Sequence, residues 1–266
     1  MNIAQQSLNE NCMQYRMTDT DVAYVADVSD IHVGNLYHNR EAFETFIEKV
    51  KAIPKMRLII GGDSTDNSYT QSASSVFEQG LDGGDQIIAL RDILKPIRDQ
   101  ILFVRSGNHG YERALKFNKL IPEQMLAELL GLPFFHGMAS VFFNVDDNCY
   151  VLGTWHNAKR PTAMEWLHTD VTFYEHLHKT NFEESVVFKP NRFTKSWTAD
   201  THYDVQSGSW LGWGGYSADK GYRPQKCSTN IIQLSGGGSK KRNIRVFSDI
   251  DHVLELELMK GQLAND

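Results

Sequence analysis

The sequence predicts an α/β fold in which a largely parallel sheet is followed by a β-rich second half. Up to about residue 120, short apolar runs alternate with amphipathic helical patterns, which is typical of parallel strands joined by helices. Beyond that point strand patterns predominate, and no Pro-rich, low-complexity or repeated segment marks a boundary. We therefore expect one domain with two sheets at residues 22–258, after a polar lead-in (1–21) and before a C-terminal tail (259–266).

Three apolar runs of the first half end in polar loops and are expected to be strands: residues 23–30, 56–63 and 101–109. Residues 39–53 carry apolar side chains at spacings of three and four, which predicts an amphipathic helix that ends before Pro54. Residues 83–99 predict a second helix, bent or ended by Pro96. Loops at the carboxyl ends of parallel strands are the usual place for a ligand site.

The second half begins with a helix at residues 121–132 that stops at Gly131, then a hairpin formed by residues 140–145 and 149–155. Residues 163–184 predict another helix. Four further runs are expected to be strands: residues 204–210, 230–234, 243–247 and 252–258. The Gly-rich segment 235–241 lacks the spacing of a phosphate-binding loop and is expected to be a hairpin turn.

Composition excludes several classes of protein. With 266 residues, 41% of them hydrophobic, the chain can bury a large core, and it contains no run of eighteen apolar residues. A membrane partner is therefore not expected. Cys12, Cys149 and Cys227 are few and far apart, which argues against a disulfide framework or a thiolate metal site. Together with the lack of a secretory signal pattern, they favour a cytoplasmic location.

Charge is unevenly distributed along the chain. The net charge is -6, yet residues 189–245 contain ten Lys and Arg against three Asp. Such a segment suggests affinity for a phosphate-rich partner, nucleic acid or nucleotide, with a solvated face as the alternative. Within it, a Gly-rich loop interleaves aromatic and basic residues: Trp210, Trp213, Tyr216, Lys220, Tyr222 and Arg223. These aromatics could stack on bases, or they could pack over a sheet edge.

Three of the predicted strands end in residues that commonly bind metals. They supply Asp30 and His32, then Asp63 and Asp66, then Asn108 and His109. Oxygen and imidazole donors without thiolates suit Mn, Fe, Zn or similar divalent ions. A carboxylate shared by two such ions can hold them about 4 Å apart, as two-metal phosphoryl chemistry requires. The three motifs together predict a metal site.

In their order, these motifs resemble those of the calcineurin-like metallophosphoesterase family: DxH, GDxxD, GNH, a His after a strand, and GHxH. The first three blocks match the six residues just named, His156 matches the fourth, and Asp200 with His202 is the best match to the fifth. The resemblance covers residues 22 to 256. It implies a four-layer α/β/β/α sandwich of two mixed sheets flanked by helices.

The resemblance also implies a two-metal phosphoesterase in which a hydroxide between the ions attacks phosphorus. By position, Asp63 would bridge the ions. The first metal would be held by Asp30, His32, Asp63 and His202, and the second by Asp63, Asn108, His156 and Asp200. His109 would stabilise or protonate the leaving oxygen. Mn is expected first, with Fe, Zn, Mg and Ni as alternatives.

Two departures from the family pattern and three cations add further expectations. Asp200 stands where the family has a His, which predicts a shift toward Mn or Mg. Gly110 stands where an acidic residue normally follows GNH, so Glu112 is expected to orient His109 instead. Substrate phosphates could be bound by Lys159, Arg160 and Arg223, which are otherwise solvated loop charges.

Three other histidines are not expected to bind a metal. On the helix predicted at residues 163–184, His176 and His178 would point about 200° apart and could not share an ion. They and His168 are therefore expected to lie on the surface.

For function, a phosphodiesterase acting on nucleic acid or a nucleotide is favoured over a phosphomonoesterase for a small molecule or phosphoprotein. A non-catalytic scaffold that kept the fold is the alternative of another class, and the oligomeric state stays open.

Overall fold

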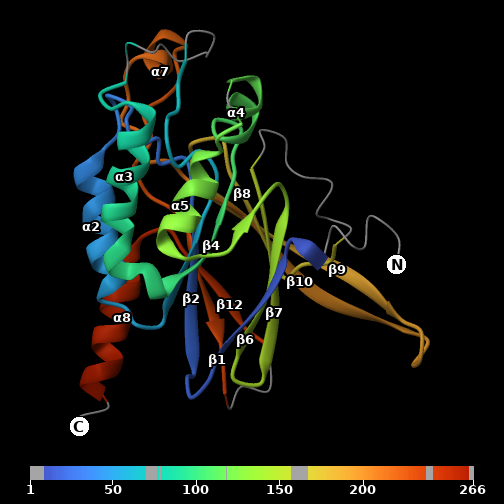
Figure 1. Ribbon diagram of the computed structural model, residues 1–266. Helices are drawn as coiled ribbons and strands as arrows, with labels where there is room; N and C mark the ends of the chain where they lie inside the picture. The colour runs from blue at the N-terminus through green and yellow to red at the C-terminus, as the bar shows by residue number, and fades with distance from the viewer. Residues whose placement is uncertain are drawn as a thin grey trace.

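Two mixed, six-stranded sheets pack face to face and are flanked by helices, as the sequence predicts (Figure 1). They are described by a computed structural model that covers residues 9–69, 77, 79–117, 119–156, 167–237 and 242–263. The first sheet has the order β12 (Ile244–Phe247), β11 (Ile231–Ser235), β2 (Val22–Val28), β3 (Met56–Ile60), β4 (Ile101–Arg105), β5 (Phe134–Phe135). The second has the order β1 (Cys12–Met17), β6 (Ala139–Val145), β7 (Asn148–Trp155), β8 (Val171–Tyr174), β10 (Ser196–Gln206), β9 (Asn181–Asn191).

Strand β2 lies between two cores, and every one of its residues is buried. Tyr24, Ala26 and Val28 belong to the core under the helices, whereas Ala23 and Val25 belong to the core between the sheets. Because side chains alternate along a strand, a strand covered on both faces is largely apolar, and in β2 the exception is Asp27, which accepts a hydrogen bond from Thr154 Oγ1 at 2.7 Å. β2, β3 and β4 run parallel, so their carboxyl ends lie at the same edge of the sheet.

The helices along the first sheet are α2 (Arg40–Lys51), α3 (Gly83–Leu94), α5 (Pro122–Leu130) and α8 (Ile250–Leu263) (Figure 1). The Asn39 side chain caps α2 by accepting a hydrogen bond from Ala42 N at 3.1 Å. α3 passes into a short 3-10 helix, η2 (Lys95–Gln100), at Pro96. Gly131 ends α5 with φ 64°, as its sequence position predicts. No helix in these described ranges is long and apolar enough to cross a membrane.

Two element predictions are wrong. Residues 163–184 do not form one helix, because Val171–Tyr174 is the buried strand β8 and β9 begins at Asn181; residues 163–166 lie outside the described part. Residues 252–258 are part of α8 rather than a strand. Their alternating apolar pattern does not follow burial, since Val253 is buried while Leu258 is exposed. Helical spacing instead brings Val253 and Glu257 to the same side, where Glu257 accepts a hydrogen bond from Tyr24 Oη at 2.6 Å.

Three segment boundaries also differ from expectation. The range 1–21 contains β1, which pairs in parallel with β6 at the edge of the second sheet. α8 extends into the range 259–266. β10 spans residues 196–206 and ends where residues 207–210 turn into a loop. β9 and β10 form a long hairpin that projects from the second sheet (Figure 1).

Candidate metal centre

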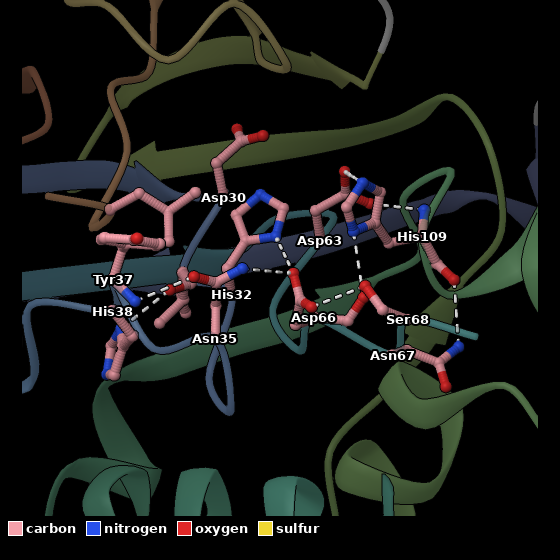
Figure 2. A network of polar contacts seen from close by, with 12 residues as sticks. Asp30, His32, Asn35, Tyr37, His38, Asp63, Asp66, Asn67, Ser68 and His109 are labelled. Carbon is pink, nitrogen blue, oxygen red and sulfur yellow. Dashed lines mark hydrogen bonds and ion pairs between the residues drawn. The ribbon is translucent and has the colours of Figure 1, made fainter. Parts of the chain in front are cut away.

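Loops from both sheets bring imidazole and carboxylate groups together near the short helices α4 (Tyr111–Phe117) and α7 (Tyr216–Asp219). The contributing loops follow β2, β3, β4, β7 and β8. The residues concerned are Asp30, His32, Asp63, Asp66, Asn108, His109, His156, His176 and His178. Figure 2 shows five of them, Asp30, His32, Asp63, Asp66 and His109, close to one another. The strand-end motifs therefore converge, as the parallel sheet predicts.

One group of ligand atoms surrounds Nε2 of His156. This nitrogen lies 2.9 Å from Asn108 Oδ1, 3.1 Å from Asp63 Oδ2 and 3.2 Å from His176 Nδ1. A ring nitrogen carries at most one proton and can donate to one partner at a time. Asp30, Asp63, His156 and His176 each offer an atom within 4.8 Å of the others. A divalent cation would satisfy all these atoms at once, so the donor set fits a metal.

A second group lies beside the first. Nε2 of His178 is 3.1 Å from Asp30 Oδ1 and 3.4 Å from His32 Nε2, and the three residues form a further potential ligand set. Asp30 belongs to both groups, so its carboxylate can contact two neighbouring ions. Asp63 Oδ1 accepts a hydrogen bond from His109 N at 2.7 Å. The bridging role expected for Asp63 stays a prediction.

Buried carboxylates make this a site of negative potential. Burial would raise the pKa of Asp63, but the neighbouring imidazole groups of His109 and His156, the latter 3.1 Å away, outweigh it and hold that pKa well below its ordinary value. The reverse holds for His156: burial would lower its pKa, but Asp63 and Asp30 raise it well above the usual value. Both shifts favour the charged forms, a carboxylate at Asp63 and an imidazolium at His156.

Positive φ angles recur among the same residues. Five non-glycine members of the cluster have positive φ: Asp30 (50°), His32 (51°), Asp63 (55°), His176 (78°) and His178 (54°). L-residues other than Asn, Asp and Gly adopt this left-handed region rarely, and it is costly. The strain turns the side chains of these loops toward one another, which is typical of a functional site.

A buried network holds His156 in place. Its Nδ1 lies 2.7 Å from Glu175 Oε2, which also accepts a hydrogen bond from Gly62 N at 2.7 Å. The other Glu175 oxygen is paired with Arg105. Because Nδ1 is engaged in this way, Nε2 is the ring nitrogen left to face Asp63 and Asn108. Sequence reasoning missed Glu175 and Arg105, although Glu175 directly precedes His176.

His32 is held in a similar way. Its Nδ1 lies 3.3 Å from Asp66 Oδ1, and Ser68 Oγ donates to the other Asp66 oxygen at 2.6 Å (Figure 2). Burial raises the pKa of Asp66, but the contact with His32 and the Ser68 hydroxyl bring it to about 2. The second Asp of the GDxxD motif therefore orients the His of the DxH motif.

His109 has a defined pattern of partners. Nδ1 lies 3.1 Å from the carbonyl of Asp66, which can only accept, and Nε2 lies 2.8 Å from Arg113 Nη2, which can only donate. The ring is therefore neutral, with its proton on Nδ1. Burial lowers its pKa to about 3, and the charges of His32 and Arg113 act in the same direction. The acid role expected of His109 would require Arg113 to release Nε2.

Glu112 was expected to replace the acidic residue that is missing after GNH, but a different glutamate lies beside Gly110. Glu112 is exposed on α4. Instead, the carboxyl of Glu123, from α5, lies against the Cα of Gly110, and a Cβ at that position would overlap it. Glu123 is fully buried. Sequence reasoning missed Glu123 and Arg113, because no local pattern places α5 beside this loop.

Asp200 and His202 are not brought to the cluster, so their assignment as metal ligands is corrected. Asp200 pairs with Lys189 at 3.0 Å and Arg242 at 3.1 Å. His202 Nδ1 donates to the Thr169 carbonyl at 2.8 Å. The histidine pair at the site is His176 and His178, in the turn after β8. The shift toward Mn or Mg that was argued from Asp200 no longer applies, and His168 is exposed.

A cavity of about 710 Å³ opens over the cluster. Its lining includes Arg113, Lys179 and Arg223 together with Trp213, Tyr216 and Tyr222. Trp210, by contrast, is buried in the core beneath the helices. Of the two interpretations of the aromatic loop, packing in the protein holds for Trp210, whereas Trp213, Tyr216 and Tyr222 are open to a ligand. Lys159 and Arg160 lie outside the described residues.

No model of a known protein family matches the chain, and no curated protein matches its sequence. Among solved structures, the zinc complex of Vps29 from Entamoeba histolytica is 10% identical, with a TM-score of 0.38; the match covers 85% of this chain and 98% of that one. A conserved uncharacterized protein, described as a predicted phosphoesterase, from Streptococcus pneumoniae TIGR4 is 11% identical with a TM-score of 0.37, covering 86% and 91%. The fold assignment rests on the sheets and helices described above.

Proposed function

We propose that this protein is a metal-dependent phosphoesterase that hydrolyses a phosphate ester at a centre for two divalent ions. One observation carries the proposal: five loops from two sheets bring seven oxygen and nitrogen ligands into two adjoining sets that share Asp30. A centre built only of carboxylate, amide and imidazole donors suits Mn, Fe, Zn or Ni, and Mg less well.

The residues that would hold the ions are Asp30, His32, Asp63, Asn108, His156, His176 and His178. Two ions bound there would activate water as a nucleophile and neutralise the charge that develops on the phosphoryl oxygens.

The other residues of the site position these ligands and the substrate. Glu175 fixes the ring of His156, and Asp66 fixes that of His32. Arg113 lines the cavity, where its guanidinium can donate two parallel N–H bonds to two phosphoryl oxygens. When Arg113 turns to such an oxygen, Nε2 of His109 is released and can take part in proton transfer to the leaving group.

A phosphodiester is the favoured substrate, because Lys179 and Arg223 extend positive charge along the cavity beyond Arg113. A phosphomonoester remains the alternative within the enzyme class. A scaffold without activity is the alternative of another class. Against the scaffold stands the strained, buried arrangement of Asp30, Asp63 and His156, which a purely structural role does not require.

Metal content and hydrolysis test the proposal together. The purified chain, reloaded with Mn, is expected to hold two ions and to hydrolyse a chromogenic phosphodiester faster than the matching monoester. Asp63→Asn serves as the blank, and His202→Ala, outside the cluster, as the matched control. Absence of bound metal under Mn-replete conditions would favour the scaffold. Activity confined to the monoester would defeat the preference for a diester.

A further inference from the structure

We propose that the substrate is a nucleotide-sized phosphate ester whose base stacks on the aromatic wall of the cavity. This inference rests on the proposed phosphoesterase function and adds the identity of the organic group. The wall consists of Trp213, Tyr216 and Tyr222, all in the segment between β10 and β11 that includes α7.

The loop that carries this wall is fixed to the metal centre. Trp210 packs in the core against Phe43 and Phe46, with ring centroids at 5.1 and 4.9 Å. Its backbone N–H donates to the carbonyl of Asp30 at 3.0 Å, and its carbonyl accepts from Asn39 N at 2.8 Å. One residue thus links the core, the aromatic loop and a candidate metal ligand. The fold therefore fixes the position of this loop relative to Asp30.

Two glycines let the loop lie flat on Tyr37. A Cβ on Gly214 would overlap the Tyr37 ring, and Gly212 N donates to the Tyr37 carbonyl at 2.7 Å. Tyr37 also lines the cavity. The loop therefore cannot swing away from the metal centre without losing this contact.

The three rings of the wall are ordered and yet partly open to solvent. Trp213 Nε1 donates to the Tyr222 carbonyl at 2.7 Å, which fixes the indole, and the Tyr216 and Tyr222 rings meet edge to face at 6.3 Å. Trp213, Tyr216 and Tyr222 remain 53%, 40% and 57% exposed. Lys220 Nζ lies over the Tyr216 ring, 5.6 Å from its centroid. An aromatic face that is held in place and open to solvent, as that of Trp213 is, can stack on a base with little ordering cost.

The charges of the cavity suit a ligand with one anionic end. Among the described residues of the lining, Asp66 is the one carboxylate, and its oxygens are engaged by His32, Asn35 and Ser68. Arg113 and Arg223 supply positive charge. The phosphate would lie at the metal centre and the base at the wall.

The size of the cavity favours a single nucleotide over duplex nucleic acid. About 710 Å³ is within the range of pockets for small ligands. Part of the basic segment 189–245 is engaged elsewhere, since Lys189, Lys226 and Arg242 pair with Asp200, Asp249 and Asp170. These cations do not form a track for a long phosphate backbone.

Binding and turnover should be measured on ligand pairs that differ only in the base. Calorimetry on the Mn-loaded protein would compare a nucleoside 5′-phosphonate, which is not hydrolysed, with the corresponding ribose 5-phosphonate. Hydrolysis would compare a nucleoside 5′-monophosphate with ribose 5-phosphate, and the methyl diesters of both. We expect the base to increase affinity and kcat/KM about tenfold or more. Trp213→Ala and Tyr216→Ala should each reduce this ratio.

Trp197→Ala is the matched control, because Trp197 is 70% exposed on β10 and is not part of the cavity lining. Equal binding of the base-free ligand, a ratio unchanged by Trp213→Ala, or tighter binding of duplex DNA would overturn the inference. Equal rates of hydrolysis for the nucleoside ester and the matching ribose ester would overturn the base site and leave the phosphoesterase proposal intact. Discrimination in binding without hydrolysis of any ester would support the base site and defeat the catalytic proposal.

Discussion

The carboxyl group of Glu123 fills the space that a side chain on Gly110 would need. Glu123 lies on α5 and Gly110 in the loop after β4, so packing of the helix on the sheet creates the contact. Neither carboxyl oxygen has a partner at normal hydrogen-bond geometry among the described residues. Burial and the nearby charge of Asp63 raise the pKa of Glu123 to about 8. Glycine is therefore required at 110 for reasons of space.

Gly110→Ala is expected to lower the free energy of unfolding by about 1–3 kcal/mol, because the added methyl group collides with the carboxyl of Glu123. Urea denaturation measures the loss. Gly83→Ala is the control, since a Cβ on Gly83 meets nothing within 4 Å. In the double variant Gly110→Ala, Glu123→Ala, the two losses should be less than additive. Full additivity would show that the two residues do not compete for one space.

The contribution of Glu123 to the stability of the metal-free protein should fall as pH rises from 4.5 to 8. Over this range folded Glu123 keeps a proton that the unfolded chain has released, so rising pH favours unfolding. In Glu123→Gln this contribution is absent. Between pH 6 and 8, the free energy of unfolding of Glu123→Gln should fall by less than that of the wild type. The difference, measured by urea denaturation in EDTA, should be on the order of 1–2 kcal/mol. Parallel declines would place the pKa of Glu123 near its ordinary value.

Variants of His176 and His178, compared with variants of Asp200 and His202, give a direct test of the metal site. His176→Ala and His178→Ala should each lose bound metal and lower hydrolysis by at least tenfold, because each removes a ligand. His202→Ala and Asp200→Asn should retain both metal and activity, since these residues lie in contacts elsewhere. Metal analysis by mass spectrometry provides the measurement. The opposite pattern would restore the assignment made from the sequence.

Glu175→Gln is expected to weaken metal binding about 10–100-fold, because a neutral amide replaces the charged carboxylate that orients His156. The substitution also leaves Arg105 buried without its charged partner, so a lower melting temperature is expected. Metal titration at a temperature where the variant is folded separates the two effects. Unchanged affinity there would assign Glu175 a role in stability alone.

Much of the site could be predicted because its residues directly follow strands that are recognisable in the sequence. Asp30, Asp63 and Asn108 each follow an apolar strand, and parallel strands bring their carboxyl ends together. The error over His176 and His178 arose from one misread segment. As part of a helix they would diverge, whereas in a turn after β8, with φ of 78° and 54°, they converge.

Other features depend on tertiary contacts that no local pattern encodes. Glu123 approaches Gly110 only because α5 packs on β4. Glu175 and Arg105 come from different sheets and meet between them. α8 was mistaken for a strand because its apolar residues alternate by chance over a short stretch, and burial of Val253 beside α2 decides for the helix.

The positive φ angles of the cluster set stability and function against each other. Glycine would remove the conformational cost at Asp30, Asp63 or His178, and would delete a ligand at the same time. Selection or design that rewards thermal stability alone would therefore tend to erase this centre while it preserves both sheets. A thermostable descendant with glycines at these positions would be a folded protein without its chemistry. Engineering of this chain should hold these loops constant and seek stability elsewhere, on its helices and sheet edges.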